Sequence, residues 1–413
     1  MEPKAPEQTQ QSTANEEVIM EEKGEMIINP NQFINDTGKE INYDKIIEQF
    51  GCSKLSKDLL DRFEKLTGTK VHPLLEREIF FSHRDFKFML DHYEAGKPLF
   101  LYTGRGPSTE SMHLGHLLPF ILTKWLQDVF KCPLVIQLSD DEKFFYQKTE
   151  KPEDLEFFIK IADENAKDII ACGFDPERTF IFKNTSYMPH FYPNVCKIQR
   201  AITYNQIKGI FGLDGSENSG KIAYPAIQAA PCMGTSFPHI FGHKNDALCV
   251  IPMGIDQDPY FRMTRDIAAK LKFPKPVCIY SKFFPALQGF KSKMSSSDEN
   301  SAIFLNDTPN KIKNKINKYA FSGGQPTIEE HREKGANLQV DIAYNYLNYF
   351  LDDEEKLKDI GAKYSKGELL TSEVKKEAIS VLQKIIGDHQ ARKSKITEEV
   401  VKSFMKIRPL LMK

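Results

Sequence analysis

The chain has 413 residues, of which 40% are hydrophobic and 27% charged, and 56 lysines and arginines nearly balance 57 aspartates and glutamates. This length predicts roughly two to three domains, and the composition excludes a disordered or fibrous protein. The apolar runs are far shorter than the roughly 20 residues that cross a bilayer and the N-terminus has no secretory signal, so we expect a cytosolic protein without a membrane span.

Residues 1–40 are expected to form an acidic, disordered extension. The first 45 residues carry ten acidic side chains against four basic ones, and the first two dozen have hardly any aliphatic residues. Such a composition does not bury enough apolar surface to offset the entropy lost on ordering.

Residues 41–95 are predicted to form an N-terminal helical segment packed on the domain that follows it. Apolar residues recur at helical spacing in 46–50, 59–66 and 86–90, and Ser56 and Asp58 are candidate caps.

Residues 96–306 are predicted to form an α/β domain with a doubly wound, Rossmann-type parallel sheet. An apolar run, a Gly-rich turn, a long helical pattern and a second apolar run follow one another at 99–102, 103–107, 113–130 and 134–138. This order is typical of a βαβ unit and a right-handed crossover. Further strand-like runs at 179–182, 247–252 and 277–280 alternate with helical patterns. Ligands of such sheets bind at the carboxyl ends of the strands, so we expect the functional residues there.

The strand signals end near residue 306. Helical patterns then predict an all-helical C-terminal domain over 307–396 and a last helix over 397–413 that returns to the α/β domain.

The strongest motif is His113-Leu114-Gly115-His116, which opens a predicted helix after a strand and a Gly-rich turn. Helix N-termini attract anions, Gly115 leaves space for a flat ring, and two imidazoles supply hydrogen-bond donors to phosphate oxygens. This arrangement suits a nucleotide. The alternative is that the histidines lie at a helix start without a role in binding. The turn at 104–107 argues against it, because its glycines leave space beside the backbone at the same strand end.

The second motif is Lys293-Met294-Ser295-Ser296-Ser297, between the sheet and the helical domain. A lysine followed by hydroxyl residues suits a loop that closes over a phosphate chain, because it offers a point charge and several donors. Alone, the pattern is a weak signal, because a lysine followed by serines usually belongs to an ordinary surface loop.

A third feature is the acidic run Asp140-Asp141-Glu142, directly after a predicted strand. Three carboxylates could indicate a divalent-metal site, or a solvated loop or helix N-terminus where negative charge is favourable.

The first two motifs resemble the HIGH and KMSKS signatures of class I aminoacyl-tRNA synthetases. Other stretches are similar to the tryptophanyl-tRNA synthetases of the eukaryotic cytosol, over roughly residues 41–408: YTGRGPSTESMHLGHLLPF, DDEK, ACGFD, NQIKGIFG, PAIQAAP, GIDQDPYFRMTRD, FFPALQG and FSGG. The resemblance implies ATP-dependent ligation of L-tryptophan to tRNA(Trp) through a tryptophanyl-adenylate, with release of AMP and pyrophosphate. It also implies Mg²⁺ that arrives with ATP, a homodimer, and anticodon binding by the helical domain 307–396.

The same resemblance assigns individual residues. The implied catalytic residues are His113, His116, Lys293 and Ser295. The implied ATP-binding residues are Thr103, Gly104, Arg105, Gly106, Gly115, Gly254, Asp256 and Met294. The implied tryptophan-binding residues are Tyr102 and Gln137 at the indole nitrogen and Glu142, Gln228 and Gln257 around the amino group. No metal site on the protein is expected. The fourth KMSKS position is Ser296 instead of lysine, so Lys293 carries that charge alone or with help from Arg105 or a magnesium ion.

Tyr102 and Gln137 also form a candidate pocket on physical grounds, because they end two adjacent predicted strands. An indole offers one N–H donor on a large flat surface, so a selective site needs an acceptor between apolar walls. Such a site rejects a ligand that leaves the acceptor unpaired. The alternative is an ordinary core tyrosine and a surface amide.

Two rival functions remain open: a tyrosyl-tRNA synthetase, which shares the fold and both signatures, and a non-catalytic synthetase-like interaction protein. The near-neutral net charge does not exclude a nucleic-acid partner, since residues 361–413 carry 12 basic against six acidic side chains. A further basic run stands where the helical domain begins: Lys311, Lys313, Lys315 and Lys318.

The seven scattered cysteines lack the spacing of a metal or redox motif, so we expect reduced thiols, mostly in the core.

Overall fold

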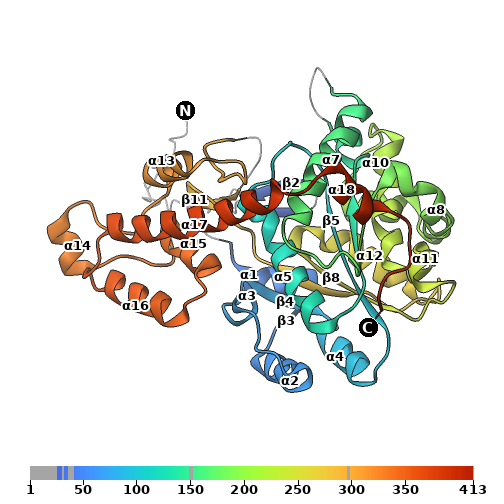
Figure 1. Ribbon diagram of the computed structural model, residues 1–413, viewed down its shortest axis with the longest axis horizontal. Coiled ribbons are helices and arrows are strands. Elements are labelled where there is room, and N and C mark those ends of the chain that lie inside the picture. Colours follow the sequence, from blue (N-terminus) through green and yellow to red (C-terminus); the bar gives the residue numbers. More distant parts are fainter. Residues whose placement is uncertain (1–25, 30–31, 36–40, 148–151, 295–297, 413) are drawn as a thin grey trace, which may run out of the picture.

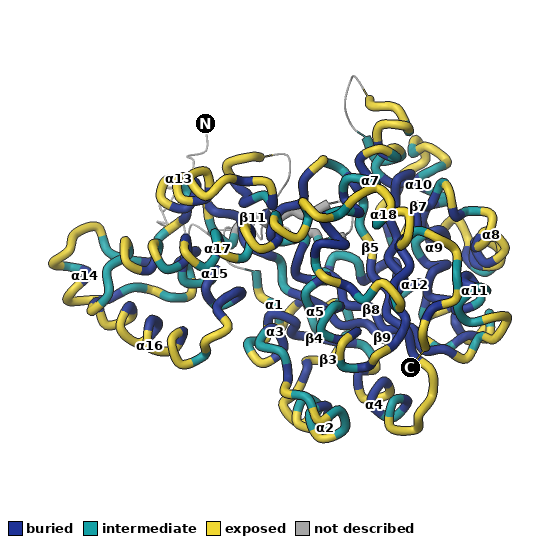
Figure 2. The backbone as a smooth tube through the Cα atoms, viewed as in Figure 1, coloured by how far each residue is buried: buried dark blue, intermediate teal, exposed yellow. Residues whose placement is uncertain are grey.

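The computed structural model describes residues 26–29, 32–35, 41–147, 152–294 and 298–412. Figure 1 shows a large lobe built around a sheet and, beside it, a smaller lobe made of α13–α17. The sheet strands are buried at the centre of the large lobe, as Figure 2 shows.

The main sheet has seven strands in the order β3-β4-β9-β8-β5-β6-β7. Five neighbours run parallel: β9 (Val277–Ser281), β8 (Leu248–Gly254), β5 (Leu99–Arg105), β6 (Leu134–Leu138) and β7 (Thr179–Lys183). β5 comes first in the chain among these five but lies in the middle, so the strand order reverses between β5 and β8. The predicted doubly wound parallel sheet is confirmed, with all five predicted strands present. Their continuous apolar runs are typical of strands covered on both faces.

Helices cover both faces of this sheet. Alternate strand residues belong to two separate apolar clusters: Leu101, Leu134 and Ile136 to one, Phe100 and Val135 to the other. The first cluster is completed by α2 (Lys57–Thr67), α4 (Phe86–Glu94), α5 (Leu114–Phe130) and α7 (Leu155–Ile170). The second is completed by α8 (Asn184–Ala201), α9 (Tyr204–Phe211), α10 (Ser219–Ala229) and α12 (Asp258–Ala268). Tyr102 lies in the second cluster.

Short elements connect these layers. They are α1 (Tyr43–Phe50), α3 (Pro73–Glu76), α6 (Glu142–Phe145), η1 (Ala230–Cys232), η2 (Gly234–Ser236), α11 (Pro238–Phe241), η3 (Ile255–Gln257) and the antiparallel pair β10 (Pro285–Ala286) and β11 (Gly289–Lys293).

The N-terminal part departs from the sequence prediction in two places. The segment 41–95 contains two strands as well as helices: β4 (Phe80–Arg84), which pairs antiparallel with β9, and β3 (Ser53–Lys54), which pairs antiparallel with β4 at the edge of the sheet. The five residues of β4 are too short a run to separate from helix by periodicity. Within the extension expected to be disordered, β1 (Met26–Asn29) and β2 (Gln32–Asn35) pair as an antiparallel hairpin, so that expectation is wrong for these eight residues. The sequence does contain a hairpin signal here, namely two short apolar runs on either side of a Pro-Asn dipeptide.

The smaller lobe consists of α13 (Pro309–Tyr319), α14 (Ile328–Lys334), α15 (Ile342–Phe350), α16 (Glu354–Ser365) and α17 (Thr371–Lys393). α17 reaches back to contact α7, and α18 (Glu398–Met405) contacts both α7 and β7 of the large lobe (Figure 1). At the junction, buried Asp168 of α7 pairs with Lys393 Nζ at 2.7 Å and with His389 Nε2 at 3.2 Å. This side-chain cluster ties the smaller lobe to the sheet.

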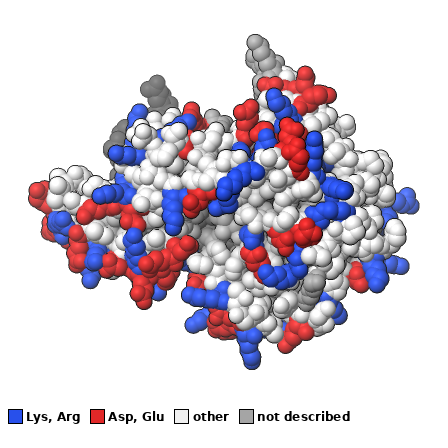
Figure 3. Space-filling view, viewed as in Figure 1, with Lys and Arg blue, Asp and Glu red and all other residues white. Residues whose placement is uncertain are grey.

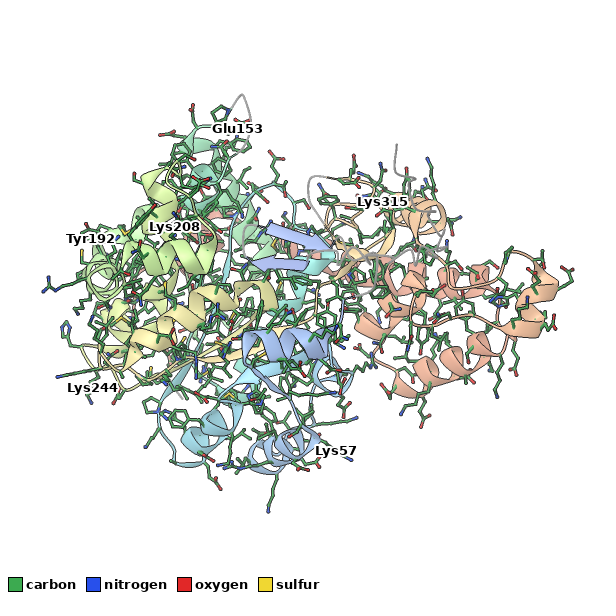
Figure 4. All side chains as sticks on the ribbon, turned by 180° about the vertical axis from the view of Figure 1, so that it is seen from behind. Lys57, Glu153, Tyr192, Lys208, Lys244 and Lys315 are labelled. Atoms are coloured by element: carbon green, nitrogen blue, oxygen red, sulfur yellow. The ribbon has the colours of Figure 1, made fainter. Side chains whose placement is uncertain are left out.

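One member of the predicted basic run in α13 does not face solvent. Lys315 is buried, donating to Asp307 Oδ2 at 2.7 Å and to the carbonyl of Ala302 at 2.8 Å (Figure 4). Lys311, Lys313 and Lys318 are exposed. A helix has an inner face, and a lysine on it needs an acid partner.

Among the described residues, no helix is long and apolar enough to span a membrane. The seven cysteines, all within the described residues, form no disulfide, and four are buried as expected: Cys132, Cys232, Cys249 and Cys278. Cys52 and Cys172 are partly exposed, and Cys196 on α8 is exposed.

Candidate functional site

A cavity of about 580 Å³ opens at the carboxyl ends of β5, β6, β8 and β9, where the strand order of the sheet reverses. Every site residue predicted from the sequence whose side chain the structure describes lines it: Tyr102, Thr103, Gly104, Arg105, Gly106, His113, Gly115, His116, Gln137, Glu142, Gln228, Gly254, Asp256, Gln257 and Met294. Lys293 is the last residue of β11, and Ser295 lies outside the described residues, as do Ser296 and Ser297. Sequence-distant residues thus meet at one end of the sheet.

The histidine motif forms the N-terminus of α5. The rings of His113 and His116 stack with their centroids 3.5 Å apart, and the backbone N–H of His113 donates to His116 Nδ1 at 3.3 Å. A Cβ on Gly115 would lie 3.1 Å from the Cβ of Phe284 and 3.2 Å from the ring of His113. Glycine therefore keeps this wall flat, which suits a planar base next to donors for its phosphates.

Arg105 connects this helix terminus to α7. Its Nη1 lies 2.9 Å from His116 Nε2 and its Nε donates to Asn165 Oδ1 at 3.3 Å. Asn165, which is buried, also donates through Nδ2 to the carbonyl of Thr109 at 2.9 Å. Burial lowers the pKa of Arg105 to about 10, so the guanidinium stays protonated at neutral pH. The cavity therefore holds a fixed positive charge beside the α5 N-terminus.

A second set of side chains lines the deeper part of the cavity. The hydroxyl of Tyr102 donates to Gln137 Oε1 at 2.5 Å and accepts from Gln228 Nε2 at 2.9 Å. Gln228 Oε1 in turn accepts from the hydroxyl of Tyr224 at 2.5 Å. The ring of Phe261 contacts Tyr102 edge to face, with centroids 5.9 Å apart. Burial raises the pKa of Tyr102, so the phenol stays neutral.

The acidic run after β6 is buried and fully engaged, which corrects the alternative of a solvated loop. Asp140 accepts from the backbone N–H and the hydroxyl of Thr185 at 3.1 and 2.5 Å. Asp141 accepts from Asn184 Nδ2 at 2.7 Å. Glu142 Oε2 accepts from the hydroxyl of Ser139 at 2.9 Å, and Glu142 is the member that lines the cavity.

Burial and the neighbouring carboxylates raise the pKa of Asp141 from 3.8 to about 7. Among the described residues, no group of three or more His, Cys, Asp or Glu side chains is arranged to hold a metal ion.

The turn after β8 supplies the remaining wall. A Cβ on Gly254 would lie 2.7 Å from Asp256 Oδ1, so glycine allows this carboxylate to fold back against the strand end. Asp256 and Gln257 belong to η3 and line the cavity beside the deeper side chains.

Sequence reasoning missed two buried amides that connect the site residues to their surroundings, Asn165 and Asn184. Both had a signal. Asn165 and Asp168 stand on the apolar stripe of α7, where a polar residue needs a buried partner. Asn184 directly follows β7, at the same edge of the sheet as Gln137. It also missed Lys282, which lies at the cavity with its ammonium 5.5 Å from the ring centre of Tyr43.

Comparison with known proteins places these features in a family. The family model for class I tRNA synthetases (W and Y) matches residues 94–387. The chain is 57% identical over 368 residues to the cytoplasmic tryptophan--tRNA ligase of Schizosaccharomyces pombe, which covers 89% of this chain and 92% of that protein. It is 56% identical over 377 residues to the cytoplasmic tryptophan--tRNA ligase of Oryctolagus cuniculus, covering 91% of this chain and 78% of that protein.

Solved structures agree. The tryptophanyl-tRNA synthetase of Plasmodium falciparum superposes with a TM-score of 0.83 at 51% identity, covering 89% of this chain and 95% of that one. The tryptophanyl-tRNA synthetase of Encephalitozoon cuniculi bound to tryptophan superposes with a TM-score of 0.82 at 42% identity, covering 89% and 98%.

Proposed function

Since the chain belongs to the W and Y family of class I tRNA synthetases, we propose that it ligates L-tryptophan to tRNA(Trp). The reaction uses ATP, passes through a tryptophanyl-adenylate and releases AMP and pyrophosphate. Its relatives are named cytoplasmic tryptophan--tRNA ligases, and we place this chain in the cytoplasm as well.

The observation that carries the choice of amino acid is the pair Tyr102 and Gln137. Both side chains are buried, and their oxygens meet at 2.5 Å inside a pocket whose wall is Phe261. In our proposal these oxygens accept the indole N–H, while Glu142, Gln228 and Gln257 surround the substrate amino group. A carboxylate suits an ammonium ion, and the flat aromatic wall suits an indole.

The ATP site in this proposal lies at the N-terminus of α5. Gly115 leaves space for the adenine, His113 and His116 donate to phosphate oxygens, and Arg105 adds a fixed positive charge. The loop 103–106 lines the same side, Gly254 and Asp256 contact the ribose, and Met294 closes the cavity beside them. Supporting this arrangement, all these residues line one cavity.

We propose that catalysis depends on positioning and charge stabilisation without a protein nucleophile. The tryptophan carboxylate attacks the α-phosphorus of ATP, pyrophosphate leaves, and the acceptor hydroxyl of tRNA then takes the acyl group. Lys293 and Ser295 act on the leaving phosphates. Mg²⁺ neutralises phosphate charge when bound, held by phosphate oxygens and water, because the described residues offer no cluster of three potential metal ligands.

A tyrosine-specific enzyme and a non-catalytic interaction protein are both less well supported. Both of the relatives compared above are tryptophan--tRNA ligases. The candidate catalytic positions carry imidazole, lysine and hydroxyl side chains that are chemically competent.

We propose that the helical domain 307–396 binds the anticodon of the tRNA, and that 397–413 returns to the catalytic domain. Exposed Lys313 and Lys318 on α13 offer positive charge to a phosphate backbone, whereas Lys311 pairs with Glu299 and Asp307. Figure 3 shows acidic side chains gathered over α16, so the basic side of this lobe is the candidate surface.

We also propose a homodimer. Aromatic side chains on α6, α8 and α9 are exposed on the large lobe: Phe144, Tyr192 and Tyr204 are 38, 52 and 44% exposed. Tyr192 lies at the outer edge of that lobe (Figure 4). Sedimentation equilibrium should give twice the chain mass, and a monomer at micromolar concentration would contradict this proposal.

The function itself is tested by ATP–pyrophosphate exchange with tryptophan and tyrosine side by side, followed by transfer to tRNA(Trp). Exchange with tryptophan and charging of that tRNA support the proposal. Exchange with tyrosine alone, or no exchange with any amino acid, refutes it.

A further inference from the structure

A chain of hydrogen bonds leads from the proposed tryptophan pocket into the protein through two residues that do not line the cavity, Asn184 and Asp141. Gln137 Nε2 donates to Asn184 Oδ1 at 2.8 Å, and Asn184 Nδ2 donates to Asp141 Oδ1 at 2.7 Å. All three side chains are buried. A carboxamide has one acceptor end and one donor end, so the orientation of each amide decides what it presents to its neighbour.

The carboxylate end of this chain fixes both amides. Above its raised pKa of about 7, Asp141 is ionised and only accepts hydrogen bonds, so Asn184 then points its Nδ2 toward it. Asn184 Oδ1 then faces Gln137 as an acceptor, so Gln137 must donate to it through Nε2. Its carbonyl oxygen Oε1 is left facing Tyr102 and the cavity. In the reverse orientation the NH₂ group of Gln137 would face the substrate, donor against donor with an indole N–H.

The position of Asn184 is itself fixed by an adjacent contact. Asn184 and Thr185 are the first two residues of α8, and Asp140 accepts from both the backbone N–H and the hydroxyl of Thr185. The adjacent carboxylates of Asp140 and Asp141 therefore hold the adjacent residues Thr185 and Asn184 at the start of α8. This leaves Asn184 little freedom to move away from Gln137.

We propose that Asn184 and Asp141 are positioning residues for amino-acid specificity: they hold the Gln137 amide with its acceptor toward the substrate, so that a side chain with an N–H donor is selected. This inference rests on the proposed function and deepens it. It assigns the selection of a donor-bearing ring to residues that do not contact the amino acid.

The test compares tryptophan with its benzothienyl analogue, in which a sulfur replaces the indole N–H with little change in shape. The measured quantity is the ratio of kcat/KM for the two in ATP–pyrophosphate exchange. For the wild type this ratio is expected to reach the order of 10⁴, as for sites built around a substrate donor. Asn184→Leu removes the acceptor for Gln137 Nε2 and should lower the ratio at least tenfold. Asn184→Asp keeps an acceptor toward Gln137 and, with one proton shared between the new carboxyl and Asp141, should keep the ratio within about threefold.

A matched control is Asn194→Leu, which removes another buried asparagine of α8 whose Nδ2 donates to Thr235 and Ser236. It should lower stability without changing the ratio. Asn184→Ser is measured in parallel with Asn184→Leu, because a short side chain cannot reach Gln137 and should give the same loss.

Equal loss of activity on both substrates in the Asn184→Leu and Asn184→Ser proteins, with the ratio unchanged, would overturn the proposal. So would loss of the ratio in Asn184→Asp. A wild type that does not activate tryptophan would instead refute the proposed function, and the two failures are therefore distinct.

Discussion

Replacing Asp141 with asparagine should change how stability depends on pH. Burial, with Asp140 and Glu142 as neighbours, raises the pKa of the Asp141 carboxyl from 3.8 to about 7 in the folded protein. A raised acid pKa means that folding disfavours the ionised form. The contribution of this group is therefore fully present below the unfolded pKa and is lost as the pH rises through about 7.

The magnitude follows from the two pKa values. Integrating the two titrations between pH 5 and pH 8 gives a loss of about 2.5 kcal/mol in the free energy of unfolding of the wild type. The asparagine side chain has no proton to lose, so the Asp141→Asn protein should escape this loss. Between pH 5 and pH 8, the difference in the free energy of unfolding between the two proteins should therefore shift by about 2.5 kcal/mol in favour of the variant.

Trp125 gives a convenient signal for this measurement. It is the single tryptophan of the chain, lies on α5 beside the sheet, and stacks on Phe63 at 5.1 Å between ring centres. Urea unfolding followed by its fluorescence at several pH values reports the sheet domain. Asp266→Asn, at an exposed position on α12, is the matched control for removing one negative charge. Parallel pH profiles for the wild type and Asp141→Asn would refute the reasoning.

Four further predictions concern catalysis, binding and the junction of the lobes. Lys293→Ala should slow pyrophosphate exchange by orders of magnitude while calorimetry shows tryptophan binding intact; unchanged exchange would remove Lys293 from the mechanism. Gly115→Val should raise the KM for ATP by about tenfold or more but leave the Kd for tryptophan unchanged, because a side chain there enters the proposed adenine space. Asp168→Ala should cost about 2 kcal/mol in urea unfolding, since it strips Lys393, only partly exposed, and His389 of their shared partner. The Kd for tRNA should rise steeply with salt in filter binding, and a flat salt profile would argue against phosphate contacts.

The sheet could be predicted from the sequence because its parallel strands are continuous apolar runs between turns. β6 (Leu134–Leu138) is buried along its whole length, and its one polar residue, Gln137, drew attention to the pocket. β4 was missed because a five-residue run beside helical patterns has no period of its own. The hairpin of β1 and β2 was not predicted because the residues around it have an acidic composition that is typical of disordered segments.

The candidate site was predictable where one rule applied, namely that parallel strands deliver their carboxyl ends to one edge. Examples are Arg105, Gln137 and Gly254, which are last or next to last in their strands, whereas Tyr102 lies in the middle of β5 because that strand extends beyond its predicted end. The sequence could not indicate which groups support them. Asn184 pairs with Gln137 and Asn165 with Arg105, 47 and 60 positions away in the chain, and such pairing depends on how helices pack on the strands of the sheet. Likewise, two features resemble surface charge in the sequence: the acidic run after β6, and Lys315 of α13. Their buried hydrogen-bond partners are not next to them in the chain, so the sequence does not reveal them.

The contact of α18 with β7 bears on how the chain is made. β7 is an edge strand of the sheet, and α18, which packs against it, follows the whole smaller lobe in the chain. The backbone N–H of Leu411 also donates to the carbonyl of Glu177, just before that strand. While the smaller lobe is being synthesised, β7 therefore lacks this cover, and a ribosome stalled near residue 395 would hold a sheet without it.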